Sequence, residues 1–351
     1  MKSTWLIAAA IAAMTLAVPA LAQSKRITGE STMGGSGPIK DEMTPEVRER
    51  IKKGLAWLAK QQRDDGTFGQ NQGYGGTGII AIAGLAYMAD GNMPGEGPYG
   101  REVSRVLDHV LKNCQESGLI AGPGDGSPMY GHGFATLFLA EAYGQTQRAD
   151  LKEKLQNAVR LLVQTQNKEG GWRYQPQPVD ADISVTICQI MALRAARNAG
   201  VKVPKLTIDR AIDYVKKSQE PDGGFSYTLQ SRGSAFPRSA AGLACLYYAG
   251  VYEGKEVENA IKYLAKFIPG DRGNMGAGEY HYFYGHYYNT QAMFMAGGDA
   301  WAKYWPAIRA DMLKRQQNDG GWSGEAGNVY ATGMALIILQ MPNRLLPILQ
   351  K

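Results

Sequence analysis

A short segment recurs four times along this chain of 351 residues, and this repetition restricts the possible folds more than any other feature. The copies read LAKQQRDDGTFG (58–69), LVQTQNKEGGWRY (162–174), VKKSQEPDGGFSY (215–227) and LKRQQNDGGWSG (313–324). Each contains Gln-x3-Gly-x-aromatic, and the glutamines of the middle two copies lie 53 residues apart. The other two intervals are about twice as long, so each holds one degenerate unit, at 103–144 and 256–298. The chain therefore contains six repeats of about 50 residues.

Each repeat consists of two halves with different apolar patterns. In the first half, apolar residues such as Val47, Ile51 and Leu55 follow helical spacing, and the opposite face carries Lys, Arg and Glu. The second half is apolar nearly all round, as in IIAIAGLAYMA (79–89) and FATLFLAEAYG (134–144). A helix of the second kind must be buried on all sides. These patterns predict an all-α fold, a single six-repeat α/α toroid in which six outer helices surround six parallel inner helices and a central cavity.

The first 22 residues, MKSTWLIAAAIAAMTLAVPALA, have the pattern of a secretory signal peptide, with a lysine near the start, an apolar run and an A-x-A cleavage site at 20–22. Residues 23–45 are polar and rich in Gly and Ser, which predicts a flexible leader, and the toroid then occupies 46–351. No later apolar run approaches the roughly 18 residues of a membrane span. We therefore expect a periplasmic or secreted protein without an integral membrane segment after cleavage.

The starts of the six apolar helices can be aligned on a hydroxyl residue. Five-residue windows end on Thr77, Thr136, Thr186, Ser239, Thr290 and Thr332, and they begin on Gly73, His132, Asp182, Ala235, His286 and Asn328. Since equivalent positions of parallel inner helices lie at one height, we expect four of these side chains to face one end of the cavity: His132, Asp182, His286 and Asn328. Helix N-termini at that end favour anions. The alternative is that Asp182 and Asn328 only cap their helices and that the histidines are structural.

The Gln-x3-Gly-x-Trp/Phe repeat resembles the QW-type repeat of the prenyltransferase and squalene cyclase superfamily, over about residues 47–341. This resemblance implies the toroid fold and, less specifically, a terpenoid cyclase-like activity. The same toroid occurs in complement-like thioester proteins, but their Gly-Cys-Gly-Glu-Gln thioester sequence is absent.

The segment GGWRYQPQPVDADISVT (170–186) is similar to the acidic motif of squalene-hopene-type cyclases, Asp-x-Asp-Asp at the start of an inner helix after a Gly-Gly-Trp turn. The resemblance makes Asp182 a candidate general acid, with Asp180 holding its partner proton or charge. Two close carboxylates and an apolar cavity both raise a carboxyl pKa. The chain departs from the motif at the fourth position, Ile183, and it has one toroid where those cyclases have two. Both departures weaken the expectation of a full cyclase activity.

Cationic intermediates of cyclisation need an aromatic lining. The run EYHYFYGHYY (279–288) would supply aromatic side chains beside the same mouth, although core packing or a loop lid explains it equally well. His132, His286 and an aspartate are zinc-binding residue types. However, repeats 2 and 5 lie opposite each other on the ring, and the Asp-x-Cys pair of the protein prenyltransferases is absent. We therefore expect no metal and no cofactor.

Three function classes remain open from the sequence. The first is an exported terpenoid cyclase-like enzyme that uses Asp182 as acid, with Asp180, His132 and His286 at the same site. The second is a non-catalytic toroid that binds a small apolar or anionic ligand or a partner protein, and the third is a polysaccharide-active toroid. The formal charge of +6 is spread along the chain without a basic stripe, so no nucleic-acid partner is expected.

Overall fold

The computed structural model describes residues 42–69, 76–146, 148–270 and 280–350, all within the unit Gly35–Lys351. These residues form twelve α-helices and no strands. The outer helices are α1 (Pro45–Gln61), α3 (Gly100–Lys112), α5 (Ala149–Thr165), α7 (Lys205–Lys217), α9 (Lys255–Leu264) and α11 (Gly298–Arg315). The inner helices are α2 (Gly76–Ala89), α4 (Pro128–Tyr143), α6 (Ile183–Asn198), α8 (Phe236–Ala249), α10 (Tyr282–Ala296) and α12 (Asn328–Gln340). Short 3-10 turns lie at Ala265–Phe267, Met341–Asn343 and Pro347–Leu349.

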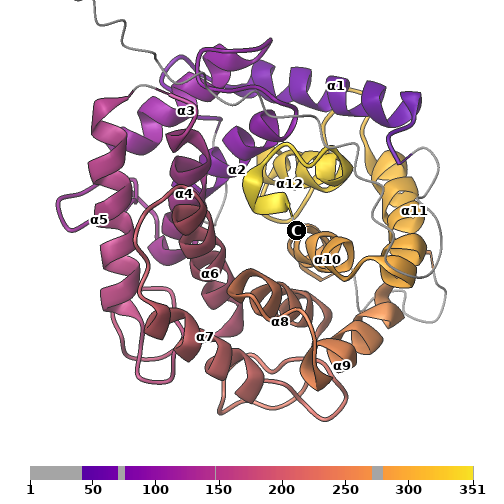
Figure 1. Ribbon diagram of the computed structural model, residues 1–351. Helices are drawn as coiled ribbons and strands as arrows, with labels where there is room; N and C mark the ends of the chain where they lie inside the picture. The colour runs from indigo at the N-terminus through magenta and orange to yellow at the C-terminus, as the bar shows by residue number, and fades with distance from the viewer. Residues whose placement is uncertain (1–41, 70–75, 147, 271–279, 351) are drawn as a thin grey trace, which may run out of the picture. The chain divides into compact units, whose positions relative to one another are not determined.

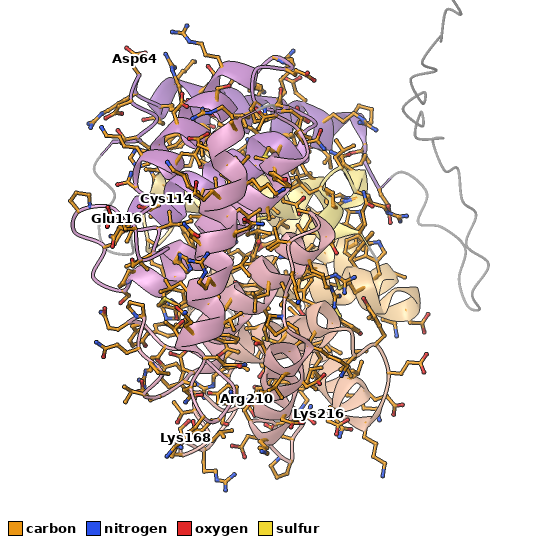
Figure 2. The ribbon with its side chains drawn as sticks, turned by 60° about the vertical axis from the view of Figure 1, so that its left-hand side comes forward. Asp64, Cys114, Glu116, Lys168, Arg210 and Lys216 are labelled. Carbon is orange, nitrogen blue, oxygen red and sulfur yellow. The ribbon has the colours of Figure 1, made fainter. Side chains whose placement is uncertain are left out.

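The helices form two concentric layers within this unit (Figure 1), which confirms the predicted α/α toroid. Each inner helix packs against the next one along the chain, and α12 packs against α2. Every residue of α2 after Gly76 is buried, as its uniformly apolar sequence predicts, whereas α1 buries only one face. Charged side chains such as Asp64, Lys168 and Lys216 are exposed and point outward from the outer layer (Figure 2). The predicted signal peptide and most of the predicted leader lie outside the described residues.

The repeated glutamine joins each turn to the following repeat. In α5, the side-chain Nε2 of Gln166 donates to the carbonyl oxygens of Gly170 and Thr207, both at 2.8 Å. The glycine adopts a left-handed φ of 105°, which places its carbonyl where the glutamine can reach it. The last repeat makes the same bonds where it meets the first repeat. Gln316 donates to the carbonyl oxygen of Gly320 at 2.8 Å and to that of Arg50 in α1 at 2.9 Å. The QW-type turn is therefore the element that links neighbouring repeats and closes the ring.

The aligned hydroxyls at the inner-helix starts also serve the turns. Thr186 Oγ1 accepts the backbone N–H of Trp172 at 3.1 Å, and Ser239 and Thr332 accept an N–H from the preceding connection in the same way. Thr77 accepts the N–H of Gly122, which lies in the connection that follows α3. Thr290 instead donates to the carbonyl of His286, one turn earlier. Thr136 Oγ1 is buried without a hydrogen-bond partner. In four of the six repeats the hydroxyl is therefore structural, because it pairs a backbone N–H of a connection.

Candidate functional site

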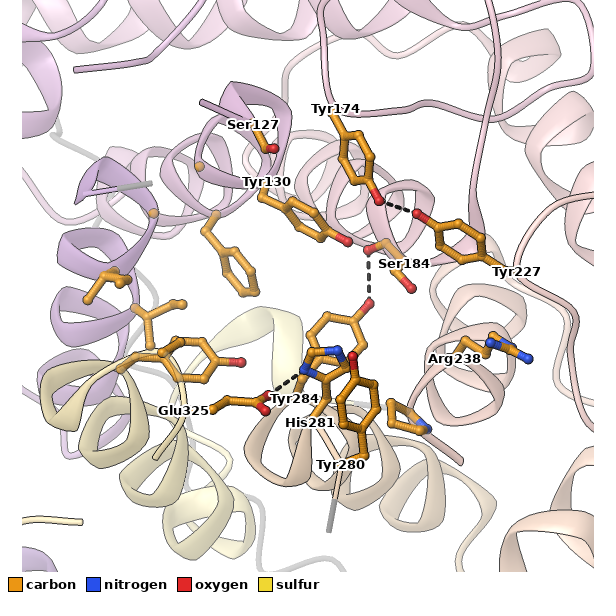
Figure 3. Close-up of a pocket in the computed structure, with 18 of the residues that line it drawn as sticks. Ser127, Tyr130, Tyr174, Ser184, Tyr227, Arg238, Tyr280, His281, Tyr284 and Glu325 are labelled. Atoms are coloured by element: carbon orange, nitrogen blue, oxygen red, sulfur yellow. Dashed lines mark hydrogen bonds and ion pairs between the residues drawn. The ribbon is translucent and has the colours of Figure 1, made fainter. Parts of the chain in front are cut away.

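A cavity of about 620 Å³ lies at the N-terminal end of the inner ring (Figure 3). Residues at or next to the start of each of the six inner helices line it, so the structure places a cavity at the end where the sequence predicts one. One side is apolar, with Ile79, Ile82 and Phe134. Hydroxyl groups and aromatic rings form most of the remaining wall: Tyr130, Tyr174, Ser184, Tyr227, Tyr280, Tyr284 and Tyr330. This volume is in the range of small-molecule sites, roughly 300–1,000 Å³.

Two charged groups and a histidine belong to the described part of the wall. Arg238, in the first turn of α8, donates from Nε to the carbonyl of Phe225 at 3.0 Å and from Nη2 to the carbonyl of Gly233 at 2.8 Å. Glu325 accepts a hydrogen bond from Nδ1 of His281, which directly precedes α10. The cavity is thus mainly aromatic and apolar, with its charges confined to the rim formed by α8, α10 and the loop before α12.

Asp182 lies just behind this wall and is fully buried. It is the N-cap of α6, where Oδ1 accepts the backbone N–H of Val185 at 2.9 Å. Oδ2 accepts the hydroxyl of Tyr227 at 3.4 Å and lies 3.6 Å from Nε of Arg173. Burial raises the pKa of Asp182 to about 6, against the opposing effects of the Val185 N–H and the Arg173 guanidinium. Asp182 therefore caps α6, as predicted, and its carboxyl also has the raised pKa that was expected of an acid.

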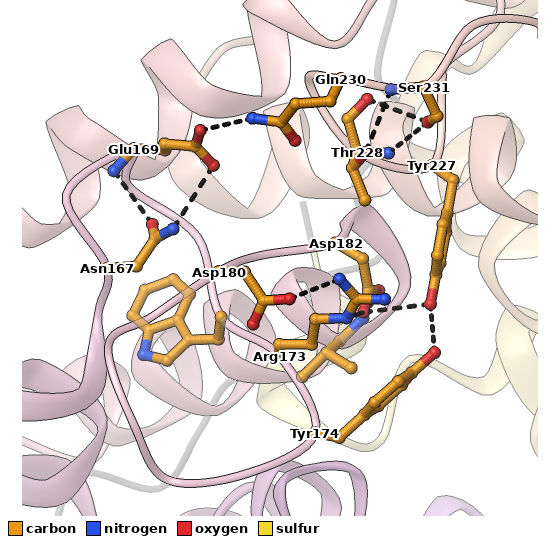
Figure 4. Close-up of polar contacts among 12 residues, drawn as sticks. Asn167, Glu169, Arg173, Tyr174, Asp180, Asp182, Tyr227, Thr228, Gln230 and Ser231 are labelled. Carbon is orange, nitrogen blue, oxygen red and sulfur yellow. Dashed lines mark hydrogen bonds and ion pairs between the residues drawn. The ribbon is translucent and has the colours of Figure 1, made fainter.

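Asp180 occupies a different environment two residues earlier (Figure 4). Its carboxylate is about half exposed and accepts a hydrogen bond from Nη1 of Arg173 at 2.5 Å. Arg173 thus bridges both aspartates, and its guanidinium also lies 5.2 Å from the ring centre of Tyr174 and 5.5 Å from that of Tyr227. The hydroxyls of these two tyrosines are hydrogen-bonded to each other. The aspartates are joined by an arginine rather than by a shared proton, and Tyr174 and Tyr227 line the cavity whereas the aspartates do not.

His132 and His286 lie inside their helices and face away from the cavity. Their helices, α4 and α10, begin four residues before the histidine, whereas α6 begins directly after Asp182. His132 Nδ1 accepts the N–H of Ile120 at 3.1 Å, and His286 Nδ1 is hydrogen-bonded to the hydroxyl of Tyr304 in the outer helix α11 at 2.9 Å. Burial lowers the pKa of His132 to about 4 and that of His286 to about 3. Neither lines the cavity, so the expected cluster with Asp182 does not form.

A model of the prenyltransferase alpha-alpha toroid domain matches residues 42–276, more than half of the chain. The chain belongs to this family. The match begins close to the N-terminal limit predicted from the repeats, and the closed ring of helices extends the toroid domain beyond residue 276 to α12.

Other toroid proteins resemble this prenyltransferase-type domain in part of their sequence or in fold. Drimenyl diphosphate synthase from Streptantibioticus cattleyicolor is 28% identical over 144 residues, which are 40% of this chain and 22% of that protein. The matched region thus spans about a fifth of the curated relative. The type II terpene cyclase MstE from Scytonema, in complex with its substrate geranylgeranyl dihydroxybenzoate, superimposes with a TM-score of 0.61 at 15% identity, over 86% of this chain and 98% of that chain. An alpha-1,6-mannanase from Salegentibacter sp. HEL1_6 reaches a TM-score of 0.62 at 10% identity, over 85% and 99%. These structural likenesses show the fold.

The residues of the toroid that reach the cavity differ from the predicted site residues by a few positions. In the shared Tyr-Gly-His of repeats 2 and 5, the tyrosines, Tyr130 and Tyr284, line the cavity and the histidines do not. Tyr174 and Tyr227 follow the aromatic residue of two adjacent QW-type turns by two positions, in GGWRY and GGFSY. This repeated tyrosine was a detectable signal. Glu325 and Arg238 had no comparable signal, because they lie at unrelated positions of their repeats.

Two further findings concern the described residues of the prenyltransferase-type toroid. No group of three or more His, Cys, Asp or Glu side chains in them is arranged to hold a metal ion. None of their helices has the length and apolar character to cross a membrane.

Proposed function

We propose that this protein is an exported toroid that binds an elongated apolar small molecule of the isoprenoid type in the cavity at its inner-helix starts. The observation that carries the proposal is the cavity itself: about 620 Å³, apolar on one side, aromatic on the other and poor in charge. Burial of an apolar chain against such a wall contributes roughly 25 cal/mol per Å² of area removed from water. The family and the terpenoid ligand of the Scytonema cyclase support an isoprenoid over other apolar molecules.

A larger side chain in the cavity should weaken this binding. Ala235 precedes α8, lines the cavity, and has an extended backbone without a side-chain capping bond, so a larger residue fits its conformation. We expect purified protein to bind geranylgeraniol, and Ala235→Trp to weaken the affinity at least tenfold, as measured by isothermal titration calorimetry. Leu206→Trp is the control, because Leu206 is 67% exposed on α7 outside the cavity. Equal affinities for Ala235→Trp and the unchanged protein would place the ligand elsewhere and refute the proposal.

Acid catalysis by Asp182 is a second candidate, favoured by one specific contact. Tyr227 both lines the cavity and donates to Asp182, whose pKa of about 6 keeps a fraction of the carboxyl protonated at neutral pH. A proton from Asp182 would reach a ligand through the Tyr227 hydroxyl, since Asp182 itself does not line the cavity. Formation of a cyclic product from a polyene alcohol, lost in Asp182→Asn and in Tyr227→Phe, would support this role. Equal product formation by all three proteins would exclude it.

A polysaccharide-active function ranks below these two. Glycoside hydrolysis generally uses a pair of carboxyl groups about 5–9.5 Å apart on either side of the bond that is cleaved. In the part of the wall that the structure describes, Glu325 is the one carboxylate, and it is paired with His281. The mannanase resemblance therefore supports the shared fold rather than a shared reaction.

We infer export from the signal-like sequence of residues 1–22. Expression in a bacterial host should yield a mature protein that begins at Gln23, recovered from the periplasm or the medium and identified by intact mass. A product that keeps residues 1–22 and stays in the cytoplasm would contradict export.

A further inference from the structure

His281 and Glu325 form a polar pair on the wall of an otherwise aromatic cavity. They come from different repeats: His281 directly precedes α10, and Glu325 follows the Gly-Gly-Trp turn that leads to α12. Both line the cavity, and Figure 3 shows them on the same side of it, beside Tyr284 and Tyr280. Their side chains are 37% and 45% exposed, so a molecule in the cavity can reach them.

The contacts of His281 leave one ring nitrogen available. Nδ1 is bonded to the Glu325 carboxylate, which can only accept, so Nδ1 carries the proton and Nε2 of the neutral ring keeps its lone pair. Nε2 has no hydrogen-bond partner among the described residues. The ring of Tyr280 packs against the imidazole, with ring centres 4.0 Å apart. A carboxylate that orients an imidazole in this way is the arrangement by which histidine acts as a general base.

The backbone of His281 supports a specific placement of this ring. His281 has φ 52° and ψ 44°, the left-handed conformation that residues with a side chain seldom adopt. Such conformations persist where the surrounding structure imposes them, and they occur often at functional sites. Here the conformation places the imidazole before the first turn of α10, against Glu325.

We propose that His281 and Glu325 form an acid–base dyad that removes a proton from a weakly acidic hydroxyl group, a phenol or an enol, on the ligand of this cavity. The inference rests on the proposed binding of an apolar ligand and adds the class of its polar group. In the step, the ligand O–H bond breaks, the proton forms a new N–H bond at Nε2 of His281, and the ligand keeps the electron pair as an oxyanion. Glu325 stabilises the resulting imidazolium. The reverse transfer returns the proton, and no oxidant or co-reactant is needed.

The ligand class follows from the groups available. An imidazole can accept a proton from a phenol or an enol, whereas an aliphatic alcohol is far too weak an acid to lose one to it. The apolar side of the cavity, with Ile82 and Phe134, would hold the hydrocarbon part. The hydroxyls of Tyr130 and Ser184 line the same cavity and can donate hydrogen bonds to an oxyanion. The competing explanation is that the pair only fastens the start of α10 to the loop before α12.

A coloured phenol separates these explanations without knowledge of the natural ligand. The probe is 2-geranyl-4-nitrophenol, whose phenolate absorbs visible light and whose neutral form does not. At a pH below the pKa of the free probe, we expect binding to raise the ratio of phenolate to phenol at least tenfold, equivalent to about one pKa unit. His281→Asn and Glu325→Gln should reduce the ratio to within about twofold of that in solution. Asparagine is chosen because it tolerates the left-handed conformation.

Binding is measured separately, by equilibrium dialysis, so that the two proposals can fail independently. Asp209→Asn is the matched control, since Asp209 is an exposed carboxylate paired with Lys205 on α7, away from the cavity. It should leave both binding and colour unchanged. If the probe binds the unchanged protein as the neutral phenol, or if the phenolate colour persists in His281→Asn, the dyad is refuted while ligand binding stands. If the probe does not bind at all, both proposals fail.

Discussion

Gly170→Ala is expected to destabilise the protein by about 2–5 kcal/mol, although the change adds a single methyl group. The backbone of Gly170 has φ 105°, a conformation in which alanine lowers the free energy of unfolding by about 1–2 kcal/mol relative to glycine. A Cβ at this position would also lie 2.1 Å from the carbonyl oxygen of Arg210, which belongs to the next outer helix, α7. Relief of that overlap requires the turn to move away from α7, and overpacking of this kind costs typically a further 1–3 kcal/mol. Urea denaturation followed by circular dichroism gives the free energy of unfolding.

Gly200 provides a matched control for this prediction. It has φ 84°, but a Cβ there would meet nothing within 4 Å. Gly200→Ala should therefore lose only the conformational contribution, about 1–2 kcal/mol. The difference between the two variants measures how closely the QW-type turn approaches the next repeat. Equal losses for both variants would show that this close approach is not part of what holds the ring together.

The second large effect is expected from Asp182→Asn as a function of pH. The pKa of Asp182 is about 6 in the folded protein and 3.8 in the unfolded chain. Between these pH values the folded protein therefore binds more protons than the unfolded chain. Its free energy of unfolding therefore decreases as the pH rises through this interval, by up to about 3 kcal/mol for a shift of this size. Asparagine keeps an oxygen that can cap the N–H of Val185 but does not titrate. The variant should gain stability relative to the unchanged protein between pH 4 and pH 7.

Urea denaturation at pH 4, 5, 6 and 7 tests this sign directly. The stability difference between Asp182→Asn and the unchanged protein should shift in favour of the variant as the pH rises. Asp209→Asn, on the surface of α7, should show a difference that changes by less than about 0.5 kcal/mol over the same range. A pH-independent difference for Asp182→Asn would mean that Arg173 and the α6 N-terminus compensate the buried carboxylate fully.

The fold could be predicted from the sequence because the same pattern of one amphipathic and one fully apolar helix recurs in every repeat. A turn motif at a regular spacing, followed by a helix that is apolar on all sides, leaves few arrangements other than two layers around a cavity. Even the degenerate units were placed correctly, since α3 with α4 and α9 with α10 fall in the intervals that lack the motif. Closure of the ring between Gln316 and Arg50 also follows from the repeat, as the last motif must contact the first helix.

The site could be predicted only in part, because alignment of the repeats assumes that all inner helices begin at the same point. Helices α4 and α10 begin four residues before His132 and His286, whereas α6 begins directly after Asp182. The two histidine rings bond to Ile120 and to Tyr304 of α11, and Tyr130 and Tyr284 line the cavity instead. For Asp182 the sequence left capping and a role as acid as alternatives; the structure shows the cap, and burial raises the pKa of the same carboxyl to about 6. His281 and Glu325 meet through the closure of the tertiary structure, which no repeat pattern encodes.

An apolar ligand in the cavity at the inner-helix starts should leave a covalent trace there when it carries a photoreactive group. The most direct measurement is photo-crosslinking of the purified protein with a diazirine-bearing analogue of geranylgeraniol, followed by peptide mapping. We expect adducts on peptides that contain Phe134, Tyr227 or Tyr284, and we expect an excess of unmodified geranylgeraniol to suppress them. Adducts on the outer helices, or adducts that an excess of geranylgeraniol does not suppress, would contradict it.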